Sequence, residues 1–89
     1  MTYKRKEFLA HANLDEATLQ IWLHEEWLIP AQHDSDESWV EADIARAKLI
    51  HDLRHHMGVN DPGVGIVLHL LDQLHDLRRA MDKLVSSRS

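Results

Sequence analysis

The C-terminal part of the chain carries an apolar repeat that restricts what the rest can fold into. Apolar residues recur there with gaps of three, four, three, four and three, at Val67, Leu70, Leu74, Leu77, Met81 and Leu84. This spacing is the a/d seam of a coiled coil. A helix over residues 62–85 would be about 36 Å long, which exceeds the width of a domain built from the remaining residues. We therefore expect a dimerisation helix, or a helix that builds a hetero-assembly, with its seam packed against the partner.

The sequence indicates where this helix starts, but it does not indicate whether two such helices pair parallel or antiparallel. Asp61 is a suitable N-cap, and Pro62 then stands at the first helical position, where its missing N–H costs nothing. The positions that flank the seam, notably Gln73 and Arg78, form no complementary charge code. The residues alone therefore leave parallel and antiparallel pairing open.

The residues before the long helix predict three shorter helices and a small hairpin. The helices are expected at residues 4–12, 15–26 and 41–57. Their ends are marked by Asn13, which tolerates the left-handed conformation, by Asp15 as a cap and by Gly58 as a terminator. Extended segments at residues 27–30 and 38–40 flank a polar, turn-rich stretch and fit a β-hairpin or wing.

This order of elements predicts a mainly α fold. The first two helices are joined by a short turn, so they form a helix-turn-helix pattern. We expect residues 1–59 to form the compact part, and residues 60–89 to form the long helix of the same structural domain.

Composition and motifs argue against several classes of function. The chain has no cysteine, which excludes disulfides, thiolate metal sites and cysteine nucleophiles. It has no nucleophile motif, no acids paired in a recognisable cleft and no phosphate-binding loop, so we expect no catalytic residue and no cofactor. His51 and His55 have the i, i+4 spacing of zinc ligands but lack a recognisable third ligand, so we expect no metal site. Nothing resembles a signal peptide or membrane span, and we expect a cytoplasmic protein without membrane contact.

Charge is distributed unevenly along the chain, which has a net charge of −5. The stretch from residue 7 to residue 45 contains no lysine or arginine and ten acidic residues, namely Glu7, Asp15, Glu16, Glu25, Glu26, Asp34, Asp36, Glu37, Glu41 and Asp43. An acidic surface favours basic protein partners and repels nucleic acid. A purely solubilising role for individual acids is the alternative.

The first half of the chain resembles the winged-helix domain of the MerR superfamily. The residues that carry this resemblance are Thr18, Leu19, Trp22, Leu28 and Pro30. Glu26 stands where the pattern of that superfamily has a glycine. The resemblance implies a MerR-like winged helix-turn-helix with a small β-hairpin and a long C-terminal dimerisation helix, and it favours antiparallel pairing of two such helices.

The second half resembles the chaperone-modulator family CbpM. The resemblance rests on Trp39-Val40 after the wing, on Leu53-Arg54-His55, and on the run of residues 61–72 from Asp-Pro-Gly to Leu-Leu-Asp. Together the two resemblances cover about residues 5–85, and the resemblance to CbpM implies a non-catalytic protein. Members bind the J-domain of the DnaJ-like co-chaperone CbpA and inhibit its cooperation with the Hsp70 chaperone DnaK.

The two resemblances predict different partners, and charge separates them. MerR-type regulators place the second helix in the major groove and contact phosphates through basic wing residues. Lysine and arginine supply most of the affinity for DNA, yet the corresponding helix and wing have neither. We therefore rank a J-domain-binding chaperone modulator first, a dimeric MerR-type transcription regulator second, and a generic adaptor for another basic protein third.

The candidate partner-binding residues follow from this ranking. They are Glu25, Glu26, Trp27, Asp34, Asp36 and Glu37. The acids are expected to dock on the basic helix that the resemblance attributes to J-domains, and so to block access by Hsp70. Trp27 is included because a partly exposed tryptophan beside Glu25 and Glu26 could anchor an interface.

Overall fold

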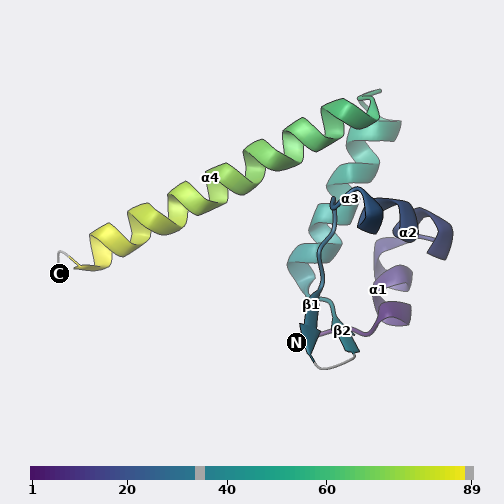
Figure 1. Cartoon of the computed structure of the whole chain (residues 1–89), viewed down its shortest axis with the longest axis horizontal. Coiled ribbons are helices and arrows are strands. Elements are labelled where there is room, and N and C mark those ends of the chain that lie inside the picture. Colours follow the sequence, from purple (N-terminus) through teal and green to yellow (C-terminus); the bar gives the residue numbers. More distant parts are fainter. Residues whose placement is uncertain (34–35, 88–89) are drawn as a thin grey trace. The chain divides into compact units, whose positions relative to one another are not determined.

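The computed structural model describes residues 1–33 and 36–87 of the chain. In chain order its elements are α1 (Arg5–Ala12), α2 (Glu16–His24), β1 (Ala31–His33), β2 (Asp36–Ser38), α3 (Glu41–His55) and α4 (Asp61–Ser87) (Figure 1). The predicted fold class is confirmed: the chain is mainly helical, with a small antiparallel hairpin and a long C-terminal helix. It divides into two compact units, Met1–Val59 and Asn60–Ser89.

The turn between α1 and α2 forms as the sequence predicts. Asn13 adopts the left-handed conformation with φ 56°, and the N–H of Leu14 bonds the carbonyl of Leu9 at 3.0 Å. This pairing is a Schellman motif, which satisfies carbonyls at the end of α1. The Asp15 carboxylate then accepts the Thr18 backbone N–H at 2.7 Å and caps α2. The hydrogen bonds from Thr18 hold the pKa of Asp15 below its ordinary value.

A second Schellman motif ends α2 at His24, which is earlier than the expected end near residue 26. Glu26 has φ 60°, the region that favours glycine. The N–H of Glu26 bonds the Leu23 carbonyl at 3.1 Å, and the N–H of Trp27 bonds the Trp22 carbonyl at 2.9 Å. The turn after α2 thus places a glutamate in the left-handed conformation, which residues with a side chain disfavour.

The hairpin is tighter than expected, because β1 begins after the predicted first segment and β2 begins before the predicted second one. The strands pair antiparallel with Ala31 opposite Ser38 and Gln32 opposite Glu37, so they lie within the stretch predicted to be turn-rich. The predicted strand at residues 27–30 was wrong, because Trp27 and Leu28 are buried in the core and a proline follows at residue 30 without an N–H for a ladder.

The predicted extended segment at residues 38–40 has a different partner from the one expected. Trp39 pairs with Tyr3, whose N–H bonds the Trp39 carbonyl at 2.7 Å and whose carbonyl accepts the Trp39 N–H at 3.0 Å. The Glu41 carboxylate accepts a hydrogen bond from the Tyr3 hydroxyl at 2.6 Å, and this bond raises the pKa of Tyr3. These hydrogen bonds from Tyr3 therefore hold the N-terminal segment next to the residues that follow the hairpin.

Aromatic side chains dominate the interior of Met1–Val59. The rings of Phe8 and Trp39 stack with centroids 4.0 Å apart, and those of Trp22 and Trp27 lie 6.2 Å apart at a tilt. The other buried apolar residues of this unit are Ala12, Leu19, Leu28, Ile44, Ala47, Ile50 and Leu53. These side chains come from α1, α2, α3 and both flanks of the hairpin, so the core fixes how those elements pack together.

Helix α3 begins and ends with local bonds. The Asp43 carboxylate accepts the Val40 backbone N–H at 2.9 Å, which satisfies a donor at the helix start. The helix ends at His55, two residues before the expected end at residue 57. Gly58 then has φ 66°, and the Val59 N–H bonds the Leu53 carbonyl at 2.8 Å, so the predicted glycine stop is confirmed.

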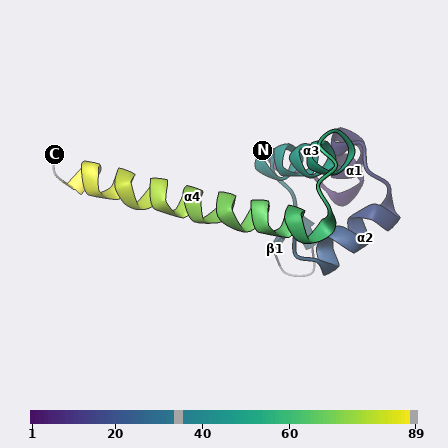
Figure 2. The ribbon, with the colours of Figure 1, turned by 90° about the horizontal axis from the view of Figure 1, so that it is seen from above.

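The second unit consists of α4, a single continuous helix of 27 residues (Figure 2). Its cap is Asn60, whose side-chain oxygen accepts the Gly63 N–H at 2.9 Å. The expectation that Asp61 is the cap was wrong, and Pro62 occupies the second helical position, where an N–H is still not required. Val64 and Leu68 are buried near the start of the helix. No helix in the described ranges is long and apolar enough to cross a membrane.

Candidate functional site

The apolar seam of α4 is open to solvent along most of its length. The exposed fractions of Leu70, Leu74, Leu77, Met81 and Leu84 range from 41% to 65%, and Val67 is half-buried. Ile66 and Val85 flank this stripe and are exposed as well. Contiguous apolar stripes of this kind mark surfaces that contact another protein. The dimer itself stays a prediction.

The candidate partner-binding residues lie in different environments. Glu25, Glu26 and Asp36 are exposed, whereas Glu37 is half-buried. Asp34 lies outside the described residues. Trp27 is 5% exposed, so the expectation of a partly exposed tryptophan was wrong. Its indole packs in the core against Trp22, and its carbonyl accepts a hydrogen bond from Arg46 Nε at 2.6 Å.

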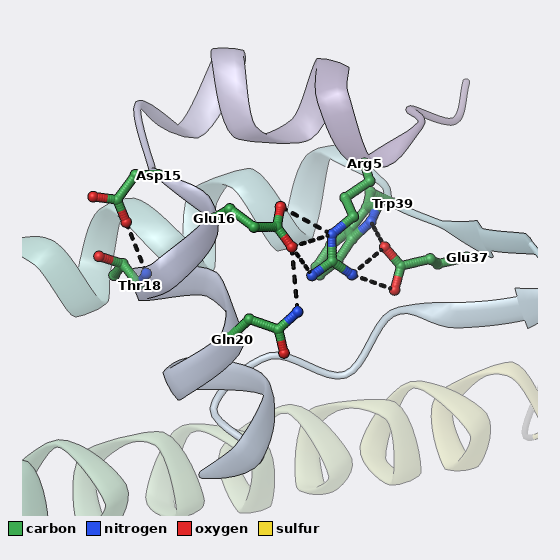
Figure 3. Close-up of polar contacts among 7 residues, drawn as sticks. All are labelled: Arg5, Asp15, Glu16, Thr18, Gln20, Glu37 and Trp39. Carbon is green, nitrogen blue, oxygen red and sulfur yellow. Dashed lines mark hydrogen bonds and ion pairs between the residues drawn. The ribbon is translucent and has the colours of Figure 1, made fainter.

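Arg5 joins three elements through two carboxylates (Figure 3). Its guanidinium, from α1, binds Glu16 of α2 through Nε at 2.9 Å and also through Nη2. Its Nη1 donates to both oxygens of Glu37 in β2, at 2.8 Å and 3.0 Å. Trp39 Nε1 donates to the same Glu37 carboxylate at 3.3 Å. We call Arg5, Glu16 and Glu37 the Arg5 clamp.

The electrostatics of the clamp follow from this geometry. The hydrogen bonds to Glu16 and Glu37 raise the pKa of Arg5 despite some desolvation. The same bond from Arg5 holds the pKa of Glu16 below its ordinary value. A planar guanidinium shared by two carboxylates is a geometry that lysine cannot reproduce. The clamp therefore fixes α1, α2 and the hairpin relative to one another.

The clamp changes which acids are available to a partner. Glu16 and Glu37 are already paired by Arg5. Glu25, Glu26 and Asp36, which we call the acidic set, are exposed and form no ion pair with another residue in the described part of the chain. Sequence reasoning missed Arg5 because it lies outside the cation-free stretch, and only the fold brings it beside Glu16 and Glu37.

The outward side of α2 has a defined composition. Leu19 and Trp22 face the core, whereas Ala17, Gln20, Ile21, His24 and Glu25 are exposed. We call these five residues the α2 outer face. Ile21 is 57% exposed, one turn before Glu25 and one turn after Ala17. Sequence reasoning missed Ile21 because a single apolar residue on a short helix carries no signal of its orientation.

Comparison with known protein families finds a match to the MerR HTH family regulatory proteins over residues 3–85. The chain belongs to this MerR-type family. No curated protein matches it. The family match covers both units and agrees with the helix-turn-helix of α1 and α2, the hairpin that follows, and the long α4.

Within the MerR-type family the equivalent of α2 is the helix expected to enter the major groove. In this chain neither α2 nor the hairpin contains a lysine or arginine. Arg5, a cation that the fold places beside both elements, has its guanidinium bound to Glu16 and Glu37. The DNA-reading elements of the family are thus present here with an acidic surface.

The histidines of α3 form a small cluster within this MerR-type fold. The rings of His51 and His55 lie 4.4 Å apart, and His56 Nδ1 lies 2.9 Å from Asp52 Oδ1. In the part of the chain that the structure describes, no three potential ligands gather in a geometry that could hold a metal ion. The i, i+4 histidine pair therefore contributes ring contacts on the helix surface.

Proposed function

We propose that this MerR-type chain is a non-catalytic chaperone modulator. It binds the J-domain of a DnaJ-like co-chaperone in the cytoplasm and restrains the cooperation of that co-chaperone with Hsp70. The observation that carries the proposal is the acidic surface of α2 and the hairpin, two elements that contain no lysine or arginine. The resemblance to the CbpM family supplies the class of partner.

Electrostatics supports a basic protein over DNA. DNA affinity comes mainly from cations that neutralise phosphates, and several such contacts are needed for each site. The α2 outer face instead ends at Glu25, which Glu26 follows in the chain, so a polyanion is repelled from this surface. The same charges attract a basic helix and raise its association rate.

The proposal includes a homodimer formed through α4. Five large apolar side chains of its seam are exposed, and a helix of this length is about 40 Å long at 1.5 Å per residue. Pairing two seams would cover these side chains and give each dimer two copies of the acidic set.

A dimeric DNA-binding regulator is the second candidate, and the family match favours it. It requires phosphate contacts from somewhere other than α2 and the hairpin. Lys4 and Lys6 are exposed cations at the start of the chain, but two lysines give a weak and strongly salt-dependent interaction.

Charge reversal at one residue of the acidic set tests the proposal. Glu25→Lys should weaken binding of a purified J-domain about tenfold at low salt, and the loss should shrink as salt screens the interaction. Asp82→Lys, on exposed α4, makes the same charge change and should bind like the wild type. Isothermal titration calorimetry measures both. Equal affinity of the Glu25 variant, the Asp82 variant and the wild type would remove the acidic set from the binding site.

A further inference from the structure

Ile21 has no role in the fold described above. It lies in the middle of α2, and its exposed fraction of 57% contrasts with 0% for Leu19 and 1% for Trp22 on the same helix. A β-branched apolar residue lowers helix propensity slightly and gains nothing from water. Its position on the one helix that the family uses for recognition makes it a candidate contact residue.

The neighbours of Ile21 on the α2 outer face define what could pack there. Residues four apart on a helix are neighbours, so Ala17 and Glu25 flank Ile21 on one line. Gln20 and His24 form the adjacent line, and both are exposed. The surface is therefore a short strip with a small residue, an apolar residue and an acid in successive turns.

The length of the strip sets the size of the partner element. From Ala17 to Glu25 the helix rises about 12 Å, which is a little over two turns. Another helix crossing it would contact this strip with two or three of its own turns. Ala17 has a short side chain, which allows the backbone of a partner helix to approach closely at that end.

We propose that the α2 outer face is the docking surface for a basic amphipathic helix, with Ile21 as its apolar anchor. An apolar side chain of the partner packs on Ile21 and Ala17, and a lysine or arginine one turn away pairs with Glu25. Complementary charge selects this occupant: Glu25 lies one turn from Ile21, Glu26 follows Glu25 in the chain, and neither acid forms an ion pair with another described residue. The inference rests on the proposed function, because it assigns the surface through which the J-domain binds.

Interface energetics predict a large effect for this one side chain. A few well-packed residues near the centre of an interface carry most of the binding energy, and exposed charges at the rim carry less. Removal of the Ile21 side chain should thus weaken binding at all salt concentrations. Removal of the Glu25 charge should act mainly at low salt.

A matched pair of isoleucine variants tests the inference. Ile29 is 70% exposed but lies after α2, outside the α2 outer face, so Ile29→Ser is the control for Ile21→Ser. Both variants remove the same side chain from an exposed site, and circular dichroism should show both folded like the wild type. The probe is a purified J-domain of a DnaJ-like co-chaperone, titrated into the full chain in a calorimeter.

The expected result is a loss of affinity of about tenfold or more for Ile21→Ser at both low and high salt. Ile29→Ser should stay within about threefold of the wild type. If the wild type binds and both variants bind equally well, the docking surface lies elsewhere and the proposed function stands. If the wild type itself does not bind the J-domain, the proposed function fails and the inference fails with it.

Discussion

Glu26 occupies a backbone position that suits glycine. Its φ of 60° is forced by the Schellman motif at the end of α2, where the Trp27 N–H must reach the Trp22 carbonyl. The resemblance to the MerR superfamily places a glycine at this position. The chain therefore keeps a local conformational strain and gains an exposed acid beside Glu25.

Substitution of this residue should stabilise the fold. Glu26→Gly relieves the left-handed strain and is expected to gain about 0.5–1 kcal/mol, because part of the gain is offset by the freedom of glycine in the unfolded chain. Glu25→Gly makes the same charge change at φ −75° and should destabilise the fold or leave it unchanged. Thermal unfolding at one protein concentration compares the two variants. A Glu26→Gly protein no more stable than the Glu25→Gly protein would contradict this reading of the α2 end.

The Arg5 clamp makes a second prediction at the residue scale. Arg5→Ala removes a guanidinium that joins two carboxylates and should lower Tm by roughly 4–8 °C at neutral pH. Arg79→Ala breaks an exposed pair with Asp76 on α4 and should change Tm little. Thermal unfolding followed by circular dichroism measures both. Similar losses in the two variants would mean that the clamp is no stronger than a surface ion pair.

The clamp also sets a direction for the pH dependence. Because Arg5 lowers the pKa of Glu16 in the folded chain, the unfolded chain binds more protons than the folded chain as the pH falls through the glutamate range. The stability from this pair is present at neutral pH and is lost below about pH 4. The Tm difference between the wild type and Arg5→Ala should shrink over that range. A difference that stays constant to low pH would contradict the ion-pair account.

At the scale of elements, the sequence predicts the positions of the helices. For the hairpin it predicts the existence but not the positions of the strands. Apolar spacing and capping residues such as Asp15 and Gly58 are local signals, and they placed the helices to within about two residues. The strand pairing of Gln32 with Glu37 involves polar residues on short strands, which leave no alternation to read. The bridge from Tyr3 to Trp39 joins distant segments, and no local pattern indicates it.

The candidate site shows the same division between local and distant signals. The exposed acids Glu25, Glu26 and Asp36 could be named from charge alone. The burial of Trp27 and the occupation of Glu37 by Arg5 depend on packing between elements, so the sequence could not show them. Ile21 could be identified as a candidate contact residue only once the orientation of α2 was known. This orientation follows from the burial of Leu19 and Trp22.

Helix α4 carries the element-scale prediction. Leu74→Ser with Leu77→Ser removes two exposed apolar side chains from the middle of the seam, and should convert a dimer into a monomer or weaken the dimer at least tenfold. His75→Ser with Asp76→Ser changes the two residues between them, which lie off the seam, and should leave the dimer intact. Sedimentation equilibrium measures both. A monomeric wild type, or an equally stable dimer in both variants, would contradict a seam-mediated homodimer.

For the molecule as a whole, a DNA-binding family architecture is combined with an acidic surface. The family match covers residues 3–85, so the architecture is that of MerR-type proteins, while the stretch from residue 7 to residue 45 has no lysine or arginine. The fold places Arg5 beside this stretch, where its guanidinium forms ion pairs with Glu16 and Glu37. The remaining acids and the exposed seam of α4 then favour a dimer that displays two acidic surfaces to a basic protein.

The most direct test of this account compares the two classes of partner on one sample. The full chain is titrated into a labelled J-domain and, separately, into labelled genomic duplex fragments, with fluorescence anisotropy read at about 50 and about 150 mM salt. We expect saturable J-domain binding at both salt concentrations, weaker at the higher one, and no DNA binding at about 150 mM salt. Tight DNA binding at 150 mM salt without J-domain binding would contradict it.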